Sequence, residues 1–477
     1  MNGITGWSYR PYTRLSERAP RPPYICALAP GESTLCLAWL DGGNQEHTVY
    51  YRPMKSYIAP EARAVPAGES SAALGGLTPY MDYEVWVERG GKTPSQSAVR
   101  YARTGPVPGT VVNYLHPEDE IYAFSGRSLC SPSLLKLPSG RLLASMDVFA
   151  SGAPQNLTLI FASDDGGRSW DYLTDLFPCF WGKLFLHRGE VYMLANTTEY
   201  GDLVIGKSSD GGQSFCAPAR LFPGAASSLD AGPHKAPMPI VSHGGRLATA
   251  VDYGAWKLGG HMSCLLSVNE DADLMCPGNW TLSEPVPYDP AWPGTVCGPC
   301  RGLLEGSAVV SPAGELMVFY RYQITDCVPN HGKAVLLRAA AGDMEAPLSF
   351  ARVVDFNGAN SKFDVLRDPA TGKYLAVASR VASPATPNQR NVLALNVSDD
   401  LISWRCAKIL LDYSAMPPGE VGFQYVSMLL DGEDLLYLSR TSLNRARNFH
   451  DANYQTFHRL ENFRRYLAAD REEEACI

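Results

Sequence analysis

Short apolar runs separated by turn residues recur along nearly the whole chain. The runs Leu157 to Phe161 and Leu203 to Ile205 are examples, and a Gly-Gly pair follows each of them. Apolar runs this short, bounded by glycine, proline and aspartate, are typical of β-strands. The 43 glycines and 36 prolines among 477 residues suit many strands joined by tight turns. The pattern therefore predicts an all-β protein.

One octapeptide pattern, Ser-x-Asp-x-Gly-x-Ser-aromatic, occurs twice behind such runs. Its copies are Ser163 to Trp170 and Ser208 to Phe215. Glycine accepts a positive φ and aspartate hydrogen-bonds to nearby backbone amides, so each copy predicts a tight hairpin turn with an aromatic plug. The copies start about 45 residues apart, which leaves room for one four-stranded unit, and periods of about 40 to 50 residues indicate a β-propeller.

The octapeptide resembles the Asp-box of the sialidase superfamily. Two weaker copies support the period: Ser398 to Trp404 lacks the glycine, and Ser267 to Trp280 keeps only its ends around Asp271 and Asp273. The resemblance implies a six-bladed, sialidase-like β-propeller over residues 110–470. Because the Asp-boxes of that superfamily lie on the rim of the propeller, away from its active site, they indicate the fold and not the catalytic residues.

The N-terminal part of the chain has a different pattern and predicts a smaller β domain. Alternating runs lie at 34–39, which ends in a core Trp39, and at 47–52, and a step from Leu77 to Tyr83 leads into a later strand. These features resemble the fibronectin type III sandwich with its tyrosine corner. A chain of 477 residues is also long enough for about two domains. The expected division is an N-terminal extension, a β-sandwich and a propeller, at residues 1–21, 22–104 and 110–470.

Charge and cysteine content narrow the choice of partner and compartment. The net charge of −8 and the isoelectric point near 5.7 leave no basic footprint for nucleic acid, and no stretch is apolar enough for a membrane helix. The N-terminus lacks the pattern of an export signal, and the 12 irregularly spaced cysteines favour free thiols in a reducing compartment. We expect a cytoplasmic protein as the sequence stands, or a secreted one if an export signal has been removed.

Cys297 and Cys300 have the spacing of a thioredoxin motif, but they lie in a proline-rich loop among expected strands. That chemistry needs the first cysteine at the start of a helix, which leaves two ordinary cysteines or a loop disulfide as interpretations. No second cysteine pair or nearby histidine completes a zinc set, and His450 and His458 do not have the spacing of a metal pair on one helical turn. We expect no metal and no cofactor.

Four residues resemble active-site positions of the sialidase superfamily. Glu305 and Arg321 flank one strand-turn-strand pair, as do the glutamate that partners the family's nucleophile and the second of its three substrate-binding arginines. Arg390 resembles another of these arginines, and Tyr425 resembles the tyrosine nucleophile. The resemblance implies that guanidiniums clamp a substrate carboxylate, while a neutral tyrosine activated by glutamate attacks beside it without charge repulsion.

The chain departs from the family pattern in two places. Cys130 and Ser131 stand where an Arg-Ile pair would carry the first arginine, and the loop at 150–156, where an acid/base aspartate is expected, contains no Asp or Glu. The nearest candidate for the acid is then Asp147, and Asp252 and Asp364 on neighbouring units are substitutes for it or further substrate contacts. These departures favour a specificity shifted toward another acidic sugar or an unusual glycoside.

Two segments with histidines are candidates for the rim of the site. His234, beside Lys235, lies where a loop would overhang the mouth of the propeller, either as a ligand contact or as a buried, hydrogen-bonded histidine. The segment from His450 to Arg459 is expected to close the ring onto the first blade, and its His450 and Asp451 are within reach of the mouth. Both segments add polar groups to those expected around the centre of the ring.

The leading hypothesis is a glycoside hydrolase of the sialidase superfamily that removes a terminal acidic, sialic-acid-like sugar. One alternative is a polysaccharide lyase acting on a uronate, in which Arg321 or Arg390 neutralises the carboxylate and Tyr425 or His234 removes the α-proton. Another is a noncatalytic carbohydrate-binding propeller that has lost its acid. In each case the expected partner is an acidic glycan, with no nucleic acid and no membrane, and the oligomeric state is left open.

Overall fold

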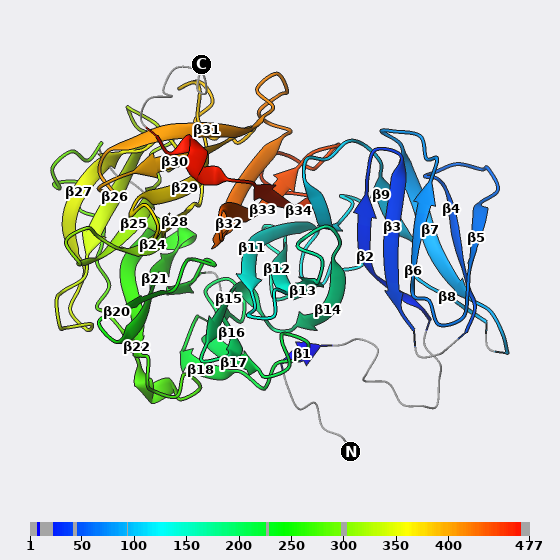
Figure 1. Ribbon diagram of the computed structural model, residues 1–477, viewed down its shortest axis with the longest axis horizontal. Coiled ribbons are helices and arrows are strands. Elements are labelled where there is room, and N and C mark those ends of the chain that lie inside the picture. The colour runs from blue at the N-terminus through cyan, green and yellow to red at the C-terminus, as the bar shows by residue number, and fades with distance from the viewer. Residues whose placement is uncertain are drawn as a thin grey trace.

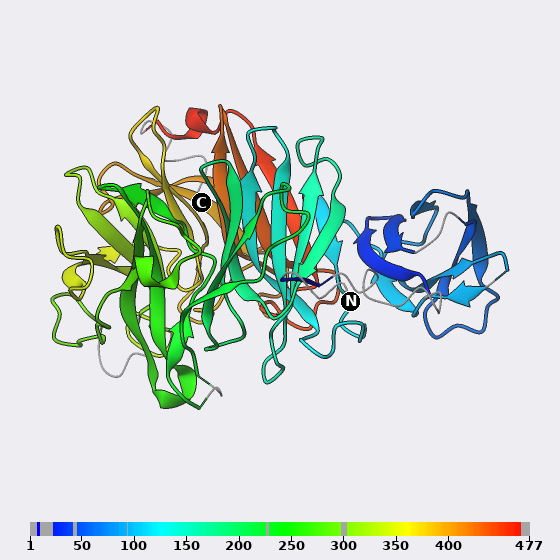
Figure 2. The same ribbon diagram turned by 90° about the horizontal axis from the view of Figure 1, so that it is seen from below.

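The computed structural model describes residues 7–9, 22–41, 45–92, 94–225, 229–296 and 303–468, and strands dominate these ranges. Figure 1 shows a ring of sheets beside a smaller pair of sheets, and Figure 2 shows the same two parts from below. The helical segments of the described ranges are short 3-10 turns, Trp256–Leu258, Pro277–Asn279 and Phe463–Tyr466. None of the described helices is long and apolar enough to cross a membrane. The all-β prediction is confirmed.

The described part of the ring consists of six antiparallel sheets, which we call blades 1 to 6 in chain order (Figure 1). Blades 1 to 3 hold β11 (Ser128–Lys136), β12 (Leu142–Phe149), β13 (Thr158–Ser163) and β14 (Asp171–Leu176); β15 (Phe180–His187), β16 (Glu190–Asn196), β17 (Leu203–Ser208) and β18 (Ala219–Phe222); and β19 (Gly232–His234), β20 (Val241–His243), β21 (Arg246–Ala255), β22 (Gly260–Asn269) and β23 (Trp280–Leu282). Blades 4 to 6 hold β24 (Leu303–Val310), β25 (Leu316–Tyr322), β26 (Lys333–Arg338) and β27 (Ser349–Asp355); β28 (Asp364–Arg367), β29 (Tyr374–Ser379), β30 (Val392–Ser398) and β31 (Trp404–Asp412); and β32 (Gly422–Asp431), β33 (Asp434–Ser442), β34 (Tyr454–Leu460) and β10 (Thr110–Tyr114).

Neighbouring blades pack face to face through apolar side chains and are joined by buried serines. Leu143 of blade 1 packs with Met193 of blade 2 in one of these shared cores. The Ser133 hydroxyl accepts a hydrogen bond from the backbone N–H of Leu184 in the next blade at 2.9 Å. Ser307 makes the same contact from blade 4 to blade 5, at 2.9 Å, and Ser427 from blade 6 to blade 1, at 3.1 Å. These hydroxyls satisfy buried amides that would otherwise be left without partners.

A strand from the beginning of the propeller closes the ring. β10 pairs with β34, with Thr110 opposite Phe457 and Tyr114 opposite Tyr454, and so forms the outermost strand of blade 6. The segment from His450 to Arg459 was predicted to close the ring onto blade 1; it closes the ring by pairing with β10, and its Phe457 packs against Trp170 of blade 1, with ring centroids 5.4 Å apart. The pairing has a physical reason: without β10, β34 would have an unpaired edge, and β10 supplies the backbone groups that complete its ladder.

The Asp-box turns are held together by their own side chains. The Asp165 carboxylate accepts hydrogen bonds from the Ser169 backbone N–H at 3.0 Å and from the Ser163 hydroxyl at 2.8 Å. Asp210 and Asp400 accept the corresponding bonds in blades 2 and 5. The bonds from the Ser169 hydroxyl and backbone lower the pKa of Asp165. Each turn joins the two outer strands of its blade, so these aspartates stabilise hairpins.

The first strands of four blades share a bulge at the same position. Ser131, Trp181, Glu305 and Tyr425 have positive φ angles of 47°, 55°, 53° and 54°. The register of each first strand shifts at this point against the second strand of its blade. A positive φ is unusual for residues other than glycine, and a bulge turns a side chain out of the regular alternation of the strand. Each bulge therefore sets the direction of one side chain at the same position of its blade.

The N-terminal region forms two sheets that share a core. One consists of β2 (Tyr24–Pro30), β3 (Thr34–Leu40) and β6 (Ser71–Gly75), and the other of β5 (Glu61–Val65), β4 (His47–Pro53), β7 (Asp82–Arg89), β8 (Ser95–Gln96) and β9 (Arg100–Arg103). Trp39, Leu77 and Tyr83 are buried in this core, as predicted. The Tyr83 hydroxyl accepts a hydrogen bond from the Thr78 backbone N–H at 2.9 Å, which ties the preceding loop to β7.

The N-terminal extension touches the propeller where it is described. β1 (Ser8–Tyr9) pairs with β14 of blade 1, and the Trp7 indole is buried between blades 1 and 2. Its ring N–H donates to the carbonyl oxygen of Pro178 at 2.7 Å. These residues add a short strand to blade 1.

The described cysteines are mostly unpaired. Cys26, Cys130, Cys179 and Cys264 are buried free thiols, whereas Cys406 belongs to a disulfide. The pair Cys297 and Cys300 lies outside the described residues, so its two interpretations stay open.

Candidate active site

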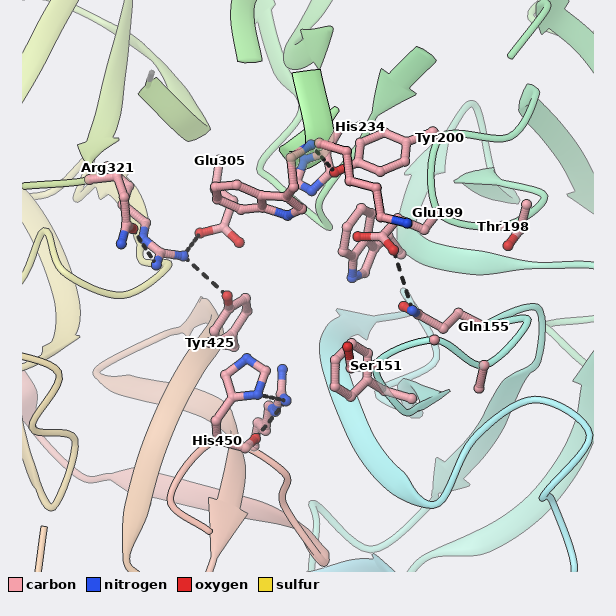
Figure 3. A pocket seen from close by; sticks show the side chains of 18 of the residues that line it. Ser151, Gln155, Thr198, Glu199, Tyr200, His234, Glu305, Arg321, Tyr425 and His450 are labelled. Carbon is pink, nitrogen blue, oxygen red and sulfur yellow. Dashed lines mark hydrogen bonds and ion pairs between the residues drawn. The ribbon is translucent and has the colours of Figure 1, made fainter. Parts of the chain in front are cut away.

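A cavity of about 830 Å³ lies where all six blades meet (Figure 3). Its walls carry three arginines, two glutamates and several aromatic rings. The residues that line it include Phe149, Gln155, Trp181, Glu199, Tyr200, His234, Lys257, Glu305, Arg321, Arg390, Tyr425, Arg440, Phe449 and His450. Three of the four bulge residues, Trp181, Glu305 and Tyr425, are among them, so the bulges bring side chains from three blades to the cavity.

Tyr425, Glu305 and Arg321 form a connected group at one side of the cavity (Figure 3). The Arg321 Nη1 donates to Glu305 Oε2 at 2.8 Å and to the Tyr425 hydroxyl oxygen at 3.1 Å. Burial alone would raise the pKa of Glu305, but the Arg321 charge and hydrogen bonds from Arg321 and Tyr425 outweigh it and lower that pKa. Glu305 is therefore ionised and able to accept a proton, and the Tyr425 hydroxyl lies beside it.

Arg390 and Arg440 lie near the ring of the same tyrosine. Their guanidinium carbons are 5.6 Å and 5.0 Å from the Tyr425 ring centroid. Arg390 also lies 5.3 Å from the Phe449 ring, and Arg440 lies 5.3 Å from the Phe149 ring. Aromatic faces attract cations and hold a planar guanidinium in place. Together with Arg321, these residues gather three positive charges around one hydroxyl.

The two outer arginines keep donors for a ligand. Arg390 donates through Nη1 to Gln424, and Arg440 donates through Nη2 to the carbonyl oxygen of His450 at 2.5 Å. Among the described residues, no hydrogen bond uses the Nη2 of Arg390 or the Nη1 of Arg440. Burial, together with the charges of Arg321 and Arg440, lowers the pKa of Arg390 to about 10, so it stays protonated at neutral pH. The site has donors and positive charge for an anionic group.

Arg440 was not among the residues predicted from the sequence. It lies opposite Gln424 in the hairpin of blade 6, just before the Tyr425 bulge, as Arg321 lies opposite Leu304 just before the Glu305 bulge. The register of the hairpins was the signal that would have found it. Arg440 also lies close enough to the Cys130 thiol to affect its pKa. Burial raises that pKa to about 12, and the Arg440 charge opposes the increase. A guanidinium is thus present near the position where the first-blade arginine is missing.

Asp147 and Asp252 lie at the corresponding positions in blades 1 and 3, but they do not line the cavity. Asp147 accepts a hydrogen bond from the Trp181 backbone N–H at 2.9 Å, and Asp252 accepts one from the Glu305 backbone N–H at 2.8 Å. Each aspartate thus binds the amide of a bulge in the next blade. Burial raises the pKa of Asp147 to about 8 and that of Asp252 to about 7. The structure places both as supports behind the cavity wall.

Asp364 is also buried away from the cavity. Its carboxylate accepts a hydrogen bond from Lys362 Nζ at 2.6 Å, and the same ammonium donates to the carbonyl oxygen of Val426 at 2.8 Å. Asp364 therefore forms a buried ion pair with Lys362, and its carboxylate does not line the cavity with the other predicted site residues.

His234 lines the cavity and is hydrogen-bonded as well. Its Nδ1 lies 3.2 Å from Asp252 Oδ2, and its ring is 4.1 Å from the Trp181 ring centroid and 4.5 Å from that of His261. Burial lowers its pKa to about 4, so the imidazole is neutral near pH 7. The two interpretations of His234 are thus compatible in the structure.

The opposite wall of the cavity carries a glutamate, Glu199, that no sequence pattern predicts. Glu199 Oε2 accepts a hydrogen bond from Gln155 Nε2 at 3.3 Å, and both side chains point into the cavity across from Tyr425 (Figure 3). Burial raises the pKa of Glu199 against the effect of that hydrogen bond. Gln155 belongs to the loop at 150–156, where no acid was found. No sequence spacing pointed to Glu199, because it lies in a turn of the next blade.

The remaining rim residues are His450 and Asp451. His450 lines the cavity, and its Nδ1 lies 2.9 Å from Asp451 Oδ1. Its ring is 6.3 Å from that of Tyr425. Within the described residues there is no cluster of three or more histidine, cysteine and acidic side chains that could hold a metal ion.

No family model and no curated protein matches the chain. Solved structures do. A Hadza microbial sialidase aligns over 93% of this chain and 95% of its own, with 13% identity and a TM-score of 0.50. The chain shares its fold with a sialidase. A protein of unknown function from Dyadobacter fermentans aligns over 74% and 98% of the two chains, with 15% identity and a TM-score of 0.50.

The sialidase-like propeller also resembles an arabinan-degrading enzyme. An α-L-arabinanase from Penicillium chrysogenum, solved with arabinobiose, aligns over 75% of this chain and 98% of its own, with 14% identity and a TM-score of 0.48.

Proposed function

We propose that the protein is a glycoside hydrolase that releases a terminal acidic sugar, with Tyr425 as nucleophile and Glu305 as its base. One observation carries the proposal: the Tyr425 hydroxyl lies next to the Glu305 carboxylate in a group bound by Arg321, with two further arginines around the tyrosine ring. A hydroxyl with a carboxylate base beside it is the arrangement of an activated nucleophile.

The first step is then a displacement at the anomeric carbon. Glu305 takes the phenolic proton, the Tyr425 oxygen forms a bond to the anomeric carbon, and the bond from that carbon to the leaving oxygen breaks. Water subsequently attacks the same carbon, and Tyr425 leaves and regains its proton from Glu305. Arg321 stays bonded to both groups and stabilises the charge that passes between them.

The acidic nature of the substrate follows from the charges of the cavity. Arg321, Arg390 and Arg440 outnumber the single carboxylate, Glu305, that lies among them. Arg390 and Arg440 each have a terminal nitrogen that no described residue binds, and a carboxylate accepts two parallel hydrogen bonds from such groups. Phe149, Trp181 and Phe449 add apolar surface for a sugar ring.

We also propose that residues 22–104 form a fibronectin type III-like sandwich that carries the propeller. The bond from Thr78 N–H to the Tyr83 hydroxyl, at the start of β7, supports this assignment because it resembles a tyrosine corner. Its pair of sheets with one shared core supports it as well.

The test is turnover of a panel of aryl glycosides, including sialosides and uronides, together with acidic polysaccharides. We expect aryl release by the wild type, and Tyr425→Phe should lower kcat/KM by at least about a thousandfold, since a nucleophile cannot be replaced by its surroundings. The thermal transition should change little, because the variant loses only the hydrogen bonds of one hydroxyl, with Arg321 and Glu305, each worth about 1 kcal/mol.

The matched control is Tyr437→Phe, which removes the hydroxyl of another buried tyrosine of blade 6, one that does not line the cavity. It should leave turnover unchanged. Ultraviolet absorbance of an unsaturated product without aryl release would make the protein a uronate lyase, and binding without either product would make it a carbohydrate-binding propeller.

A further inference from the structure

Hydrolysis at this site needs a proton donor that has not yet been assigned. When the glycosidic bond breaks, the leaving oxygen of an unactivated sugar must receive a proton. The loop at 150–156 brings Ser151 and Gln155 to the cavity but no carboxyl group. Asp147 is buried behind the wall and binds the Trp181 amide. The donor therefore has to come from another element.

Two carboxyl groups line the described part of the cavity, Glu305 and Glu199. Glu305 is paired with Arg321 at 2.8 Å, so it is held as a carboxylate and can serve the nucleophile but has no proton to give. Glu199 has no arginine partner in the described structure. Its one hydrogen bond from a side chain comes from the neutral amide of Gln155.

The position of Glu199 matches the task of an acid. It lies in the turn between β16 and β17 of blade 2, on the opposite side of the cavity from Tyr425, with open space between them (Figure 3). A nucleophile attacks one face of the anomeric carbon while the leaving oxygen departs on the other side. A sugar bound between the two walls would thus expose its leaving oxygen to the wall that carries Glu199.

Glu199 also lies in surroundings that keep a proton on it. The three arginines gather around the Tyr425 side of the cavity, and burial raises the pKa of Glu199. The pKa of Glu199 is thus raised and that of Glu305 is lowered, which is the pattern of an acid and a base in one site.

We propose that Glu199 is the general acid and base of this hydrolysis, oriented by Gln155. In the first step its carboxyl proton passes to the leaving oxygen as the bond to the anomeric carbon breaks. In the second step the Glu199 carboxylate takes a proton from the attacking water, which returns it to its starting state. The inference rests on the proposed function and adds to it the residue that the family pattern lacks.

Other titratable groups on this wall are engaged elsewhere. The Tyr200 hydroxyl lies 3.2 Å from His261 Nε2 and accepts from the Trp256 backbone N–H at 3.1 Å. His234 is neutral, and its Nδ1 faces Asp252.

The test compares leaving groups in Glu199→Gln and Glu199→Ala. The probes are the 4-nitrophenyl glycoside and the methyl glycoside of the sugar that the wild type releases. Nitrophenolate leaves without protonation, so formation of the glycosyl-enzyme should slow less than about tenfold. The methyl glycoside needs the acid, and its kcat/KM should fall by about a hundredfold to ten-thousandfold. Azide should restore turnover of the nitrophenyl substrate by Glu199→Ala and yield a glycosyl azide, because the small anion replaces the missing base.

Glu190→Gln is the control, since this glutamate of β16 lies outside the cavity and its ion pair with Lys207 is long, with 4.0 Å between Oε1 and Nζ. It should behave as the wild type with both probes. Equal losses on the two substrates, or no loss on the methyl glycoside, would overturn the assignment of Glu199. Absence of turnover by the wild type would instead reject the proposed hydrolase, so the two failures are distinguishable. The Ala variant keeps the test valid if the Gln variant does not fold.

Discussion

At the scale of single residues, the most informative side chain is Arg440. Its guanidinium is held between the rings of Tyr425 and Phe149, at 5.0 Å and 5.3 Å, and it donates to the His450 carbonyl oxygen. Arg440 supplies a third positive charge to a site in which Cys130 and Ser131 stand in place of the first arginine of the family pattern. A carboxylate bound there would accept a charged hydrogen bond, which contributes about 1.5 to 3 kcal/mol.

The Arg440→Met variant should therefore bind an acidic substrate more weakly. We expect KM for the acidic glycoside to rise by about tenfold to a hundredfold, which corresponds to the loss of that bond. Because the methyl ester of the same substrate has no negative charge to bind, its KM should change far less. Arg141→Met, at an exposed ion pair with Asp164 outside the cavity, is the control. An equal effect on ester and acid would show that Arg440 acts through packing.

Sequence spacing found some of these residues and missed others for physical reasons. Glu305, Arg321 and Tyr425 stand at strand positions where chain order itself shows the pattern, and the structure places them in one cavity. Arg440 becomes visible only through the register of its hairpin, and Glu199 only through the meeting of two loops from different blades. Contacts between blades have no fixed separation along the chain, so no spacing rule predicts them.

At the scale of elements, a bulge and its support recur around the ring. The amides of the Trp181 and Glu305 bulges donate to Asp147 and Asp252 of the preceding blades. A residue other than glycine with a positive φ persists only when its surroundings fix it. The turns and strands of each hairpin were predictable from glycine and apolar runs, but the bulges were not, because bulge residues as different as serine, tryptophan, glutamate and tyrosine share no signature.

Asp147→Ala separates a structural support from a catalytic acid. Loss of the carboxyl group leaves the Trp181 amide without its acceptor, and the Thr158 hydroxyl keeps only the Cys179 carbonyl oxygen, 3.2 Å away. We expect the free energy of unfolding to fall by about 1 to 3 kcal/mol and kcat/KM to change by less than about tenfold, as measured by chemical denaturation and by turnover. Asp164→Ala, at an exposed turn, should alter neither quantity. A loss of a hundredfold or more in turnover with unchanged stability would identify Asp147 as the acid after all.

At the scale of the whole molecule, buried lysines from several blades act on one another. Burial, followed by the charges of Lys183 and Lys362, lowers the pKa of Lys235 to about 7. The same causes, burial and the charge of Lys362, lower that of Lys183 to about 8. In an unfolded chain a lysine has a pKa of about 10.4. At pH values between the folded and unfolded pKa of each lysine, the unfolded chain binds more protons than the folded one. Each lysine therefore makes the free energy of unfolding rise with pH across that range.

Lys235→Met removes this dependence for one side chain. The variant should be more stable than the wild type near pH 7, and the difference should shrink by up to about 1.4 kcal/mol per pH unit as the pH rises toward 9. Denaturant unfolding at several pH values measures it. The exposed Lys92→Met should give a difference from the wild type that does not vary with pH. Parallel curves for wild type and Lys235→Met would contradict the lowered pKa.

The closure of the ring by β10 has a consequence for how the protein is made. During translation, Thr110–Tyr114 leaves the ribosome long before its partner Tyr454–Leu460 exists. Until then the nascent propeller is an open arc with exposed edges at both ends, which are surfaces that other chains can pair with. Its final step is a contact between distant parts of the chain, which makes closure slow. A chain that ends just before Tyr454 would lack β34, and without it β10 could not pair with blade 6 and the ring would stay open.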